Sequence, residues 1–253
     1  MPDNSSLVIG LGELLWDCFP TGRLPGGAPA NVAFHAQQLG LPAAVATRVG
    51  TDALGEELIA FLASKGLRTD LVQRDPDHGT GTVTVSPRPN GHTDYVFLEN
   101  SAWDFLEATA EWKAAFTHAR AVAFGTLAQR GPISRGAIHS CVRATGPECL
   151  VVYDINLRPP FYHADWIWDS LALARIVKLN DDESGILAGM LAAPAATPME
   201  VAELLLERFP KLELVCITRG GNGALGDFHR RCRRRGQHAG ENPRFIVIEF
   251  HDP

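Results

Sequence analysis

The 253-residue chain has few cysteines, no excess of basic residues and no long hydrophobic run. The five cysteines are Cys18, Cys141, Cys149, Cys216 and Cys232. An odd number without CxxC spacing fits neither a disulfide framework nor a zinc site, so reduced thiols are expected. The apolar run Leu7 to Leu11 is much shorter than a signal-peptide core or a membrane span, and Asp3 stands where a signal peptide would be positively charged. The sequence therefore predicts a cytoplasmic protein.

Acidic residues outnumber basic ones by 29 to 23, and the net charge is -6. Nucleic acids and anionic membranes both attract basic surfaces, so neither is expected as a partner. The sequence contains no GxxxxGK[ST], HRD, DFG or HExxH string, and none of its nine histidines has the spacing of a metal site. A hydrophobic content of 45% with 21% charged residues is that of a globular protein with a substantial core.

Short apolar runs alternate with one-sided helical patterns along most of the chain, which predicts an α/β protein with a mainly parallel sheet covered by helices. Strands are expected at residues 7–11, 43–48, 121–124, 150–154, 175–179 and 212–217. Helices are expected from Pro29 to Leu39, within residues 50–66, and at residues 133–143, 166–173, 181–191 and 199–208. Gly40 and Gly66 are expected to end the first two helices.

Residues 79–99 interrupt this alternation. They form two β-rich runs around Pro89-Asn90-Gly91, a sequence typical of a hairpin turn. We expect this hairpin to decorate the edge of the α/β core as a surface flap.

Residues 227–244 differ from the rest of the chain, because they contain six basic residues and no aliphatic residue except one alanine. Such a stretch cannot fill a core, so a solvated or disordered segment is expected. An anion-binding arm is the alternative. The run FIVIEF that follows reads as a strand or an exposed apolar end.

Three glycine- or acid-containing motifs stand where ligands bind in α/β proteins. They are GELLWD (Gly12–Asp17), GGAPANVA (Gly26–Ala33) and DINLR (Asp154–Arg158). Asp17 follows the first strand, where it either accepts hydrogen bonds from several hydroxyls or is a turn residue. Paired glycines allow a close approach to the backbone, and a helix start behind them presents free N–H groups.

Asn31, on the first turn of that helix, can both donate to and accept from hydroxyls. In DINLR, alternate residues Asp154, Asn156 and Arg158 are expected at the carboxyl end of a strand, the edge where open α/β sheets bind ligands. Arg158 offers a rigid fork of donors to a phosphate, or belongs to a structural ion pair.

Two further motifs are KLNDDE (Lys178–Glu183) and TRGGNG (Thr218–Gly223). Acidic residues such as Glu183 suit the N-terminus of the helix that follows this strand. The glycines at 221, 223 and 226 spell GxGxxG, which makes a dinucleotide-binding oxidoreductase a rival hypothesis. That fingerprint must open a helix, however, and no helical pattern follows it.

In this order the motifs resemble the ribokinase or PfkB group of carbohydrate kinases, and GGAPANVAFHAQQLG is most similar to its fructokinase branch. The resemblance implies a ribokinase-like three-layer α/β/α fold with a mainly parallel central sheet, a small β lid, and a missing or altered C-terminal part. Residues 1–226 would form the kinase domain, with the lid from about 12–25 and 79–103. Because the resemblance ends at about Gly226, a truncation or a shifted reading frame would explain the atypical basic tail at residues 227–253.

The same resemblance implies ATP and Mg²⁺ as cofactors, phosphorylation of D-fructose to fructose 6-phosphate, and a homodimer formed through the lid. Asp17, Gly26, Gly27, Asn31, Phe97 and Arg158 would bind the sugar. Asn180, Glu183, Thr218, Gly220 and Gly223 would bind the nucleotide, with Glu183 on Mg²⁺ through water.

The family's Gly-Ala-Gly-Asp turn, whose Asp takes the proton from the sugar hydroxyl, does not occur after Gly223. The catalytic base is therefore unknown, and Arg158 is the candidate contact for transition-state charge. The alternative function is a catalytically impaired or non-catalytic remnant that binds sugar or nucleotide. Glu99 stands near a position where relatives carry a basic residue, which leaves the identity of the sugar open.

Overall fold

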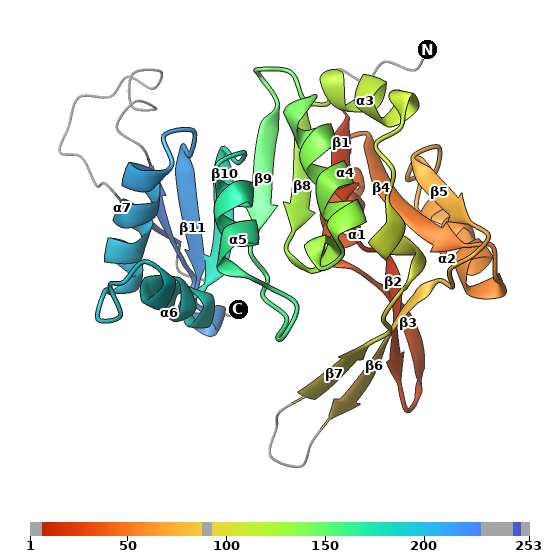
Figure 1. Ribbon diagram of the computed structural model, residues 1–253, viewed down its shortest axis with the longest axis horizontal. Coiled ribbons are helices and arrows are strands. Elements are labelled where there is room, and N and C mark those ends of the chain that lie inside the picture. The colour runs from red at the N-terminus through yellow and green to blue at the C-terminus, as the bar shows by residue number, and fades with distance from the viewer. Residues whose placement is uncertain (1–6, 88–92, 229–244, 249–253) are drawn as a thin grey trace. The chain divides into compact units, whose positions relative to one another are not determined.

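A computed structural model describes residues 7–87, 93–228 and 245–248 (Figure 1). The chain divides into two compact units, Met1–Cys149 and Leu150–Pro253, which are described separately. None of the helices in the described ranges is both long and apolar enough to span a bilayer.

The first unit is built on a parallel sheet. The apolar run at the start of the chain forms one of its inner strands. In spatial order its strands are β8 (Ala121–Gly125), β1 (Val8–Leu11), β4 (Ala43–Gly50) and β5 (Val72–Asp75). Ile9 pairs with Ala44 on one side and Val122 on the other, and all three are fully buried. A parallel sheet buried on both faces explains why these strands read as continuous apolar runs.

Helices and short 3-10 turns connect these strands. They are α1 (Ala28–Gln38), α2 (Ala53–Ser64), α3 (Ala110–Thr117), α4 (Pro132–Arg143), η1 (Ala102–Phe105) and η2 (Leu127–Gln129). As predicted, α1 begins around Pro29, and Gly40 and Gly66 follow the first two helices with positive φ. The sequence analysis missed α3, which is only eight residues long, and β5.

A second, four-stranded sheet belongs to the same unit, and Figure 1 shows it projecting from one end of the main sheet. Its order is β3 (Gly22–Gly26), β2 (Leu15–Phe19), β6 (Gly81–Pro87) and β7 (Thr93–Phe97). The predicted hairpin is confirmed as the antiparallel pair β6–β7, while its turn Pro89-Asn90-Gly91 lies outside the described residues. The hairpin β2–β3 was not predicted as strands, because β3 has the sequence GRLPG, whose glycines and proline are rare in strands.

The second unit continues the strand–helix alternation. Its sheet runs β9 (Leu150–Asp154), β10 (Ile176–Asn180), β11 (Leu214–Thr218), β12 (Ala224–Phe228) and β13 (Phe245–Ile248). The first three strands are parallel and the last two antiparallel. Its helices are α5 (Ala164–Leu171), α6 (Asp181–Met190) and α7 (Pro198–Arg208), of which α7 packs against β11 and β12.

Two parts of the predicted tail lie within the described residues. Asp227 lies in β12 and is only 6% exposed, so the strand register continues past the predicted boundary at residue 226. Phe245–Ile248 form β13, which pairs with β12, so this part of FIVIEF is a strand. The pairing of Phe245–Ile248 with β12 could not be predicted, because the sequence between the two strands has no strand pattern. Residues 229–244 lie outside the described part of the chain.

Candidate active site

Asp17 lies in the middle of β2, one strand later than the sequence analysis placed it. It is half-buried, and its neighbours across the sheet are Leu24 of β3 and Val83 of β6. Gly26 is buried beside it: a Cβ on Gly26 would stand 2.2 Å from Oδ2 of Asp17. A side chain at position 26 would therefore displace the Asp17 carboxylate from its present position.

Phe97 and Asp17 lie on the same face of the four-stranded sheet β3–β2–β6–β7, which we call the lid sheet. Val83 pairs with Asp17 on one side and with Phe97 on the other, and directly paired residues in a sheet point to the same face. Phe97 is half-buried and packs against a small apolar cluster formed by Leu15, Val83 and Val85. Strands spaced about 4.8 Å apart put the backbones of Asp17 and Phe97 about 10 Å apart. The lid thus carries a carboxylate and an aromatic ring in one row, beside a buried apolar cluster.

Gly27 and the start of α1 lie against the loop before β2. Gly27 has φ 116°, and a Cβ there would stand 2.4 Å from the carbonyl oxygen of Glu13. Oε1 of Glu13 accepts a hydrogen bond from the N–H of Ala28 at 3.2 Å, and Pro29 has no N–H. The helix start therefore has fewer open donors than predicted, because a buried glutamate already binds the first of them.

Glu13 is a residue that the sequence analysis did not single out. It is 2% exposed, and it takes the place of a capping side chain that Gly27 cannot supply. The signal was present in GELLWD as an acidic residue directly after a buried strand. Asn31 lies on the same helix turn, and its side chain is exposed.

In the second unit, the predicted alternation of DINLR ends with the strand. Asp154 is the last residue of β9, and its Oδ1 lies 3.1 Å from Nζ of Lys178, so this carboxylate is in an ion pair. Asn156 has φ 38°, which turns the chain away from the strand direction. Arg158 is half-buried, and its Nη1 donates to the carbonyl of Leu157 at 3.2 Å. Asp154 and Arg158 are thus not aligned on one strand face.

Glu183 is buried at the start of α6, and both of its carboxylate oxygens accept backbone hydrogen bonds. Oε2 accepts from the N–H of Asn180 at 2.8 Å, and the side chain of Asn180 accepts from the N–H of Glu183 at 2.9 Å, which is a capping box. Oε1 accepts from the N–H of Leu157 at 2.8 Å. Glu183 therefore joins the start of α6 to the segment that carries Arg158.

This geometry does not fit a direct magnesium ligand. Glu183 is 4% exposed and committed to two backbone amides, whereas Mg²⁺ prefers carboxylates that face its retained waters. Within the described ranges, no group of three or more His, Cys, Asp and Glu side chains is arranged to hold a metal ion. The expected contact of Glu183 with Mg²⁺ through water stays a prediction.

Thr218 ends β11 and pairs with Asn180, which ends β10. The next residues form a tight turn: Gly220–Asn222 are a 3-10 turn, and Gly223, with φ 82°, leads into β12. A Cβ on Gly220 would meet nothing within 4 Å. Asn180, Thr218 and Gly220 therefore lie together at the carboxyl edge of the second unit's sheet, where ligands bind in open α/β sheets.

The rival dinucleotide fingerprint lacks its structural context. Gly221, Gly223 and Gly226 span a turn and an antiparallel strand, and a dinucleotide site requires that the glycines open a helix whose N-terminus faces the pyrophosphate. The oxidoreductase hypothesis has no geometric support in this segment.

A parallel α/β core with polar residues at strand ends, and a separate lid sheet carrying a carboxylate, define a ribokinase-like protein. The chain belongs to the pfkB family carbohydrate kinases, whose sequence profile matches residues 11–226. It is thus a sugar kinase by family. "Probable fructokinase-2" from Arabidopsis thaliana is 29% identical over 252 residues, which cover 90% of this chain and 74% of that protein.

Solved structures share the fold. A fructokinase with bound ATP from Xylella fastidiosa superposes with a TM-score of 0.78 at 22% identity and covers 89% of this chain and 72% of its own. Aminoimidazole riboside kinase from Salmonella enterica superposes with a TM-score of 0.72 at 21% identity, covering 89% of this chain and 74% of its own. At these identities the likeness concerns the fold alone.

Proposed function

We propose that this chain is an ATP-dependent sugar kinase whose substrate is D-fructose and whose product is fructose 6-phosphate. The observation that carries the proposal is the row formed by Asp17, Val83 and Phe97 on one face of the lid sheet. A sugar has hydroxyls at its edge and apolar C–H groups on its ring faces, and this row offers a partner to each.

Asp17 would accept hydrogen bonds from neighbouring sugar hydroxyls, and charged acceptors make the stronger ones. Phe97 would cover the apolar side of the sugar and exclude water that would otherwise accept the phosphate. Gly26 and Gly27 would let the backbone approach the ligand, and Asn31 would reach a further hydroxyl from α1. Fructokinases among the relatives support fructose as the first sugar to test.

The second unit would bind the nucleotide. Arg158 supplies a fixed positive charge for a phosphate, and Asn180, Thr218, Gly220 and Gly223 form the polar edge near the ends of β10 and β11. In this proposal Glu183 acts indirectly: its bond to the N–H of Leu157 holds the segment that carries Arg158. ATP as phosphate donor is supported by the ATP-bound neighbour of the same fold.

A second candidate function is sugar and nucleotide binding with impaired phosphate transfer. Its specific support is the sequence after TRGGNG, in which no Gly-Ala-Gly-Asp string occurs. Asp227, the nearest carboxylate, is 6% exposed and pairs with Val215 inside the sheet, which does not suit a base that must meet a sugar hydroxyl.

Two measurements on the 253-residue chain separate these candidates. Calorimetric titration is expected to show D-fructose binding with a dissociation constant below about 1 mM, the usual range for enzyme substrates, and weaker binding of D-glucose and D-ribose. Coupled ADP release is expected to be slower than that of a relative with the Gly-Ala-Gly-Asp turn by about 10² to 10⁴, the usual contribution of a general base. Absence of fructose binding would refute the fructose proposal, and turnover equal to the relative's would mean that another carboxylate acts as base.

Homodimerisation through the lid is a separate proposal. Val96 and Leu98, in and next to β7, alternate with Phe97 and are 65% and 46% exposed, so a second copy could cover them on the face opposite to Phe97. Sedimentation is expected to show a dimer for the wild type and a monomer for Val96→Asp. Ile133→Asp is the control, since Ile133 is 53% exposed on α4, and it should stay dimeric. A monomeric wild type would remove the proposal.

A further inference from the structure

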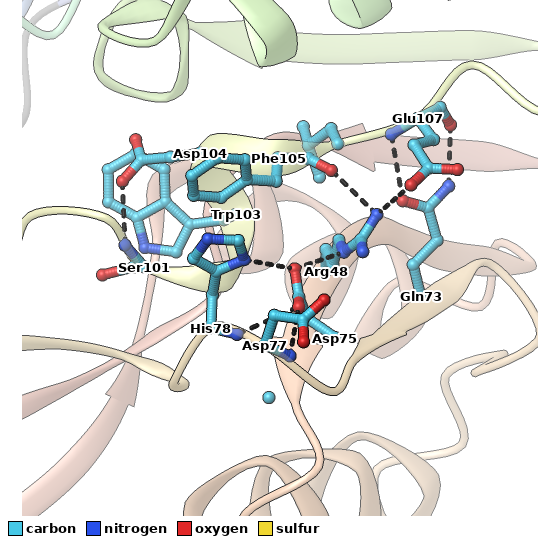
Figure 2. Close-up of polar contacts among 12 residues, drawn as sticks. Arg48, Gln73, Asp75, Asp77, His78, Ser101, Trp103, Asp104, Phe105 and Glu107 are labelled. Atoms are coloured by element: carbon cyan, nitrogen blue, oxygen red, sulfur yellow. Dashed lines mark hydrogen bonds and ion pairs between the residues drawn. The ribbon is translucent and has the colours of Figure 1, made fainter.

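The incoming end of the β6–β7 hairpin is fixed by a carboxylate that is fully buried. Asp75, the last residue of β5, accepts from the N–H groups of Asp77 and His78 at 2.9 and 3.0 Å. Its other oxygen lies 3.1 Å from Nδ1 of His78 and 2.7 Å from Nε of Arg48 in β4. Figure 2 shows these groups converging on Asp75, whose side chain is 0% exposed.

A second carboxylate binds the residue just before β6. Asp52, the N-cap of α2, accepts from the N–H and the hydroxyl of Thr80 at 2.8 and 2.7 Å. The Thr80 hydroxyl oxygen in turn accepts from the N–H of Gly50 at 3.0 Å. Because Thr80 is 2% exposed, the start of β6 is held inside the body of the unit.

The outgoing end is fixed by an ion pair of its own. Nε of Arg130 donates to Oδ1 of Asp104 at 2.7 Å and its Nη2 to Oδ2 at 2.6 Å, a two-point contact. Asp104 also accepts from the N–H of Ser101 at 3.0 Å, and Arg130 donates to the carbonyl of Leu98, directly after β7. The Arg130 guanidinium lies 4.0 Å from the centre of the Trp103 ring.

Arg48 joins the two ends. Besides its ion pair with Asp75, its Nη1 donates to the carbonyl of Phe105 at 2.9 Å and contacts the carboxylate of Glu107. The His78 ring of the incoming end also stacks on the Phe105 ring of the outgoing end, with centroids 3.6 Å apart. In Figure 2 Arg48 lies between Asp75 on one side and Phe105 and Glu107 on the other.

These contacts determine where β6 lies, and β6 is the strand on which β2 and β7 are aligned. We propose that Arg48 is a positioning residue for sugar binding. It holds the incoming and outgoing ends of the β6–β7 hairpin together, so that β6 keeps Asp17 and Phe97 in one row. The proposal rests on the proposed function, in which this row meets the sugar. Arg48 itself is not in the row, and it touches neither Asp17 nor Phe97 in the contacts described above.

The test compares Arg48→Gln with Arg68→Gln. Arg68 is a matched control, because it is an arginine of the same unit that forms a local ion pair with Asp70. Arg48→Gln is expected to weaken D-fructose binding by about 10- to 100-fold, the loss that follows from misplacing a binding group by about 1 Å, and to leave ATP affinity unchanged. Arg48→Lys, which keeps the charge but not the fork of donors, should recover part of the loss.

Amide hydrogen exchange supplies a readout that does not depend on the sugar. In Arg48→Gln the amides of β6 and β7 should exchange faster than in the wild type, while those of α4 should not change. Folded Arg48→Gln with wild-type fructose affinity would overturn the proposal. If Arg48→Gln does not fold, His78→Ala, which removes only the ring stack and one contact to Asp75, is expected to shift both readouts in the same direction.

Failure of the proposed function gives a different result. If the wild type binds no fructose, the proposed function is refuted. Hydrogen exchange still decides whether Arg48 holds the β6–β7 hairpin in place. Unchanged exchange in β6 and β7 of Arg48→Gln would then overturn the role of Arg48, and faster exchange confined to these strands would support it.

Discussion

Asp17→Asn is expected to weaken D-fructose binding by about 100-fold. The substitution keeps the size of the side chain and removes its charge. A hydrogen bond to a charged group contributes about 1.5–3 kcal/mol, and one between neutral groups about 1 kcal/mol. If two sugar hydroxyls bind the carboxylate, the difference amounts to about 2–3 kcal/mol, which corresponds to the stated loss. Calorimetric titration with D-fructose measures it directly.

Asp70→Asn is the matched control for this experiment. Asp70 is an aspartate of the same unit that is 54% exposed and paired with Arg68, so its loss should leave fructose affinity unchanged. The melting temperature of Asp17→Asn should stay near that of the wild type. Fructose binding that survives Asp17→Ala combined with Asn31→Ala would refute the placement of the sugar on the lid face.

Asp75→Ala is expected to lower the free energy of unfolding of its unit by about 3–5 kcal/mol, the usual cost of removing one partner from a buried ion pair. The substitution leaves the N–H groups of Asp77 and His78 without their acceptor and removes the main partner of Arg48. Urea unfolding monitored by tryptophan fluorescence measures the effect. Asp70→Ala, which breaks an exposed pair, should cost less than about 1 kcal/mol.

The pH dependence provides an internal check of the same prediction. Burial opposes ionisation of Asp75, but the N–H groups of Asp77 and His78, the His78 ring and Arg48 outweigh it, so its pKa lies below the usual value. A carboxylate whose pKa is lowered by folding stabilises the fold above its unfolded-state pKa of about 3.9. This stabilisation is lost as the pH falls through the folded-state pKa. The difference between wild type and Asp75→Ala should therefore be constant near pH 7 and shrink below about pH 4. A difference that grows on acidification would contradict the assignment.

Much of the fold could be predicted from the sequence because it depends on local patterns. The burial of β1 on both faces of its sheet follows from its apolar run. The helix at Asp181–Met190 follows from Asn180 and Glu183, whose spacing forms a capping box. The hairpin β6–β7 was recognisable from two β-rich runs around a turn sequence. Short elements without a strong pattern, such as β2 and β5, were missed.

The candidate site was predicted less completely. The sequence indicated Asp17 and Phe97 separately, but their common face depends on the register of β6 against two strands from different parts of the chain. Glu183 was predicted beside a metal, and in the structure it binds the N–H of Leu157, 26 positions away. Glu13 was overlooked because its contact with Ala28 joins two separate motifs.

The sequence by itself determined the family, the order of the motifs and the alternation of strands and helices, because glycine positions, caps and apolar periodicity act on neighbouring residues. Only the tertiary structure decided which carboxylates bind backbone amides or ion-pair partners of the fold, and on which face of the lid sheet Asp17 lies. Asp17 is half-buried on one face of the lid sheet. Glu183 accepts hydrogen bonds from backbone amides, and Asp75 pairs with Arg48 and His78. An acidic side chain looks the same in sequence in all three places, and its role follows from partners that folding brings together from distant positions.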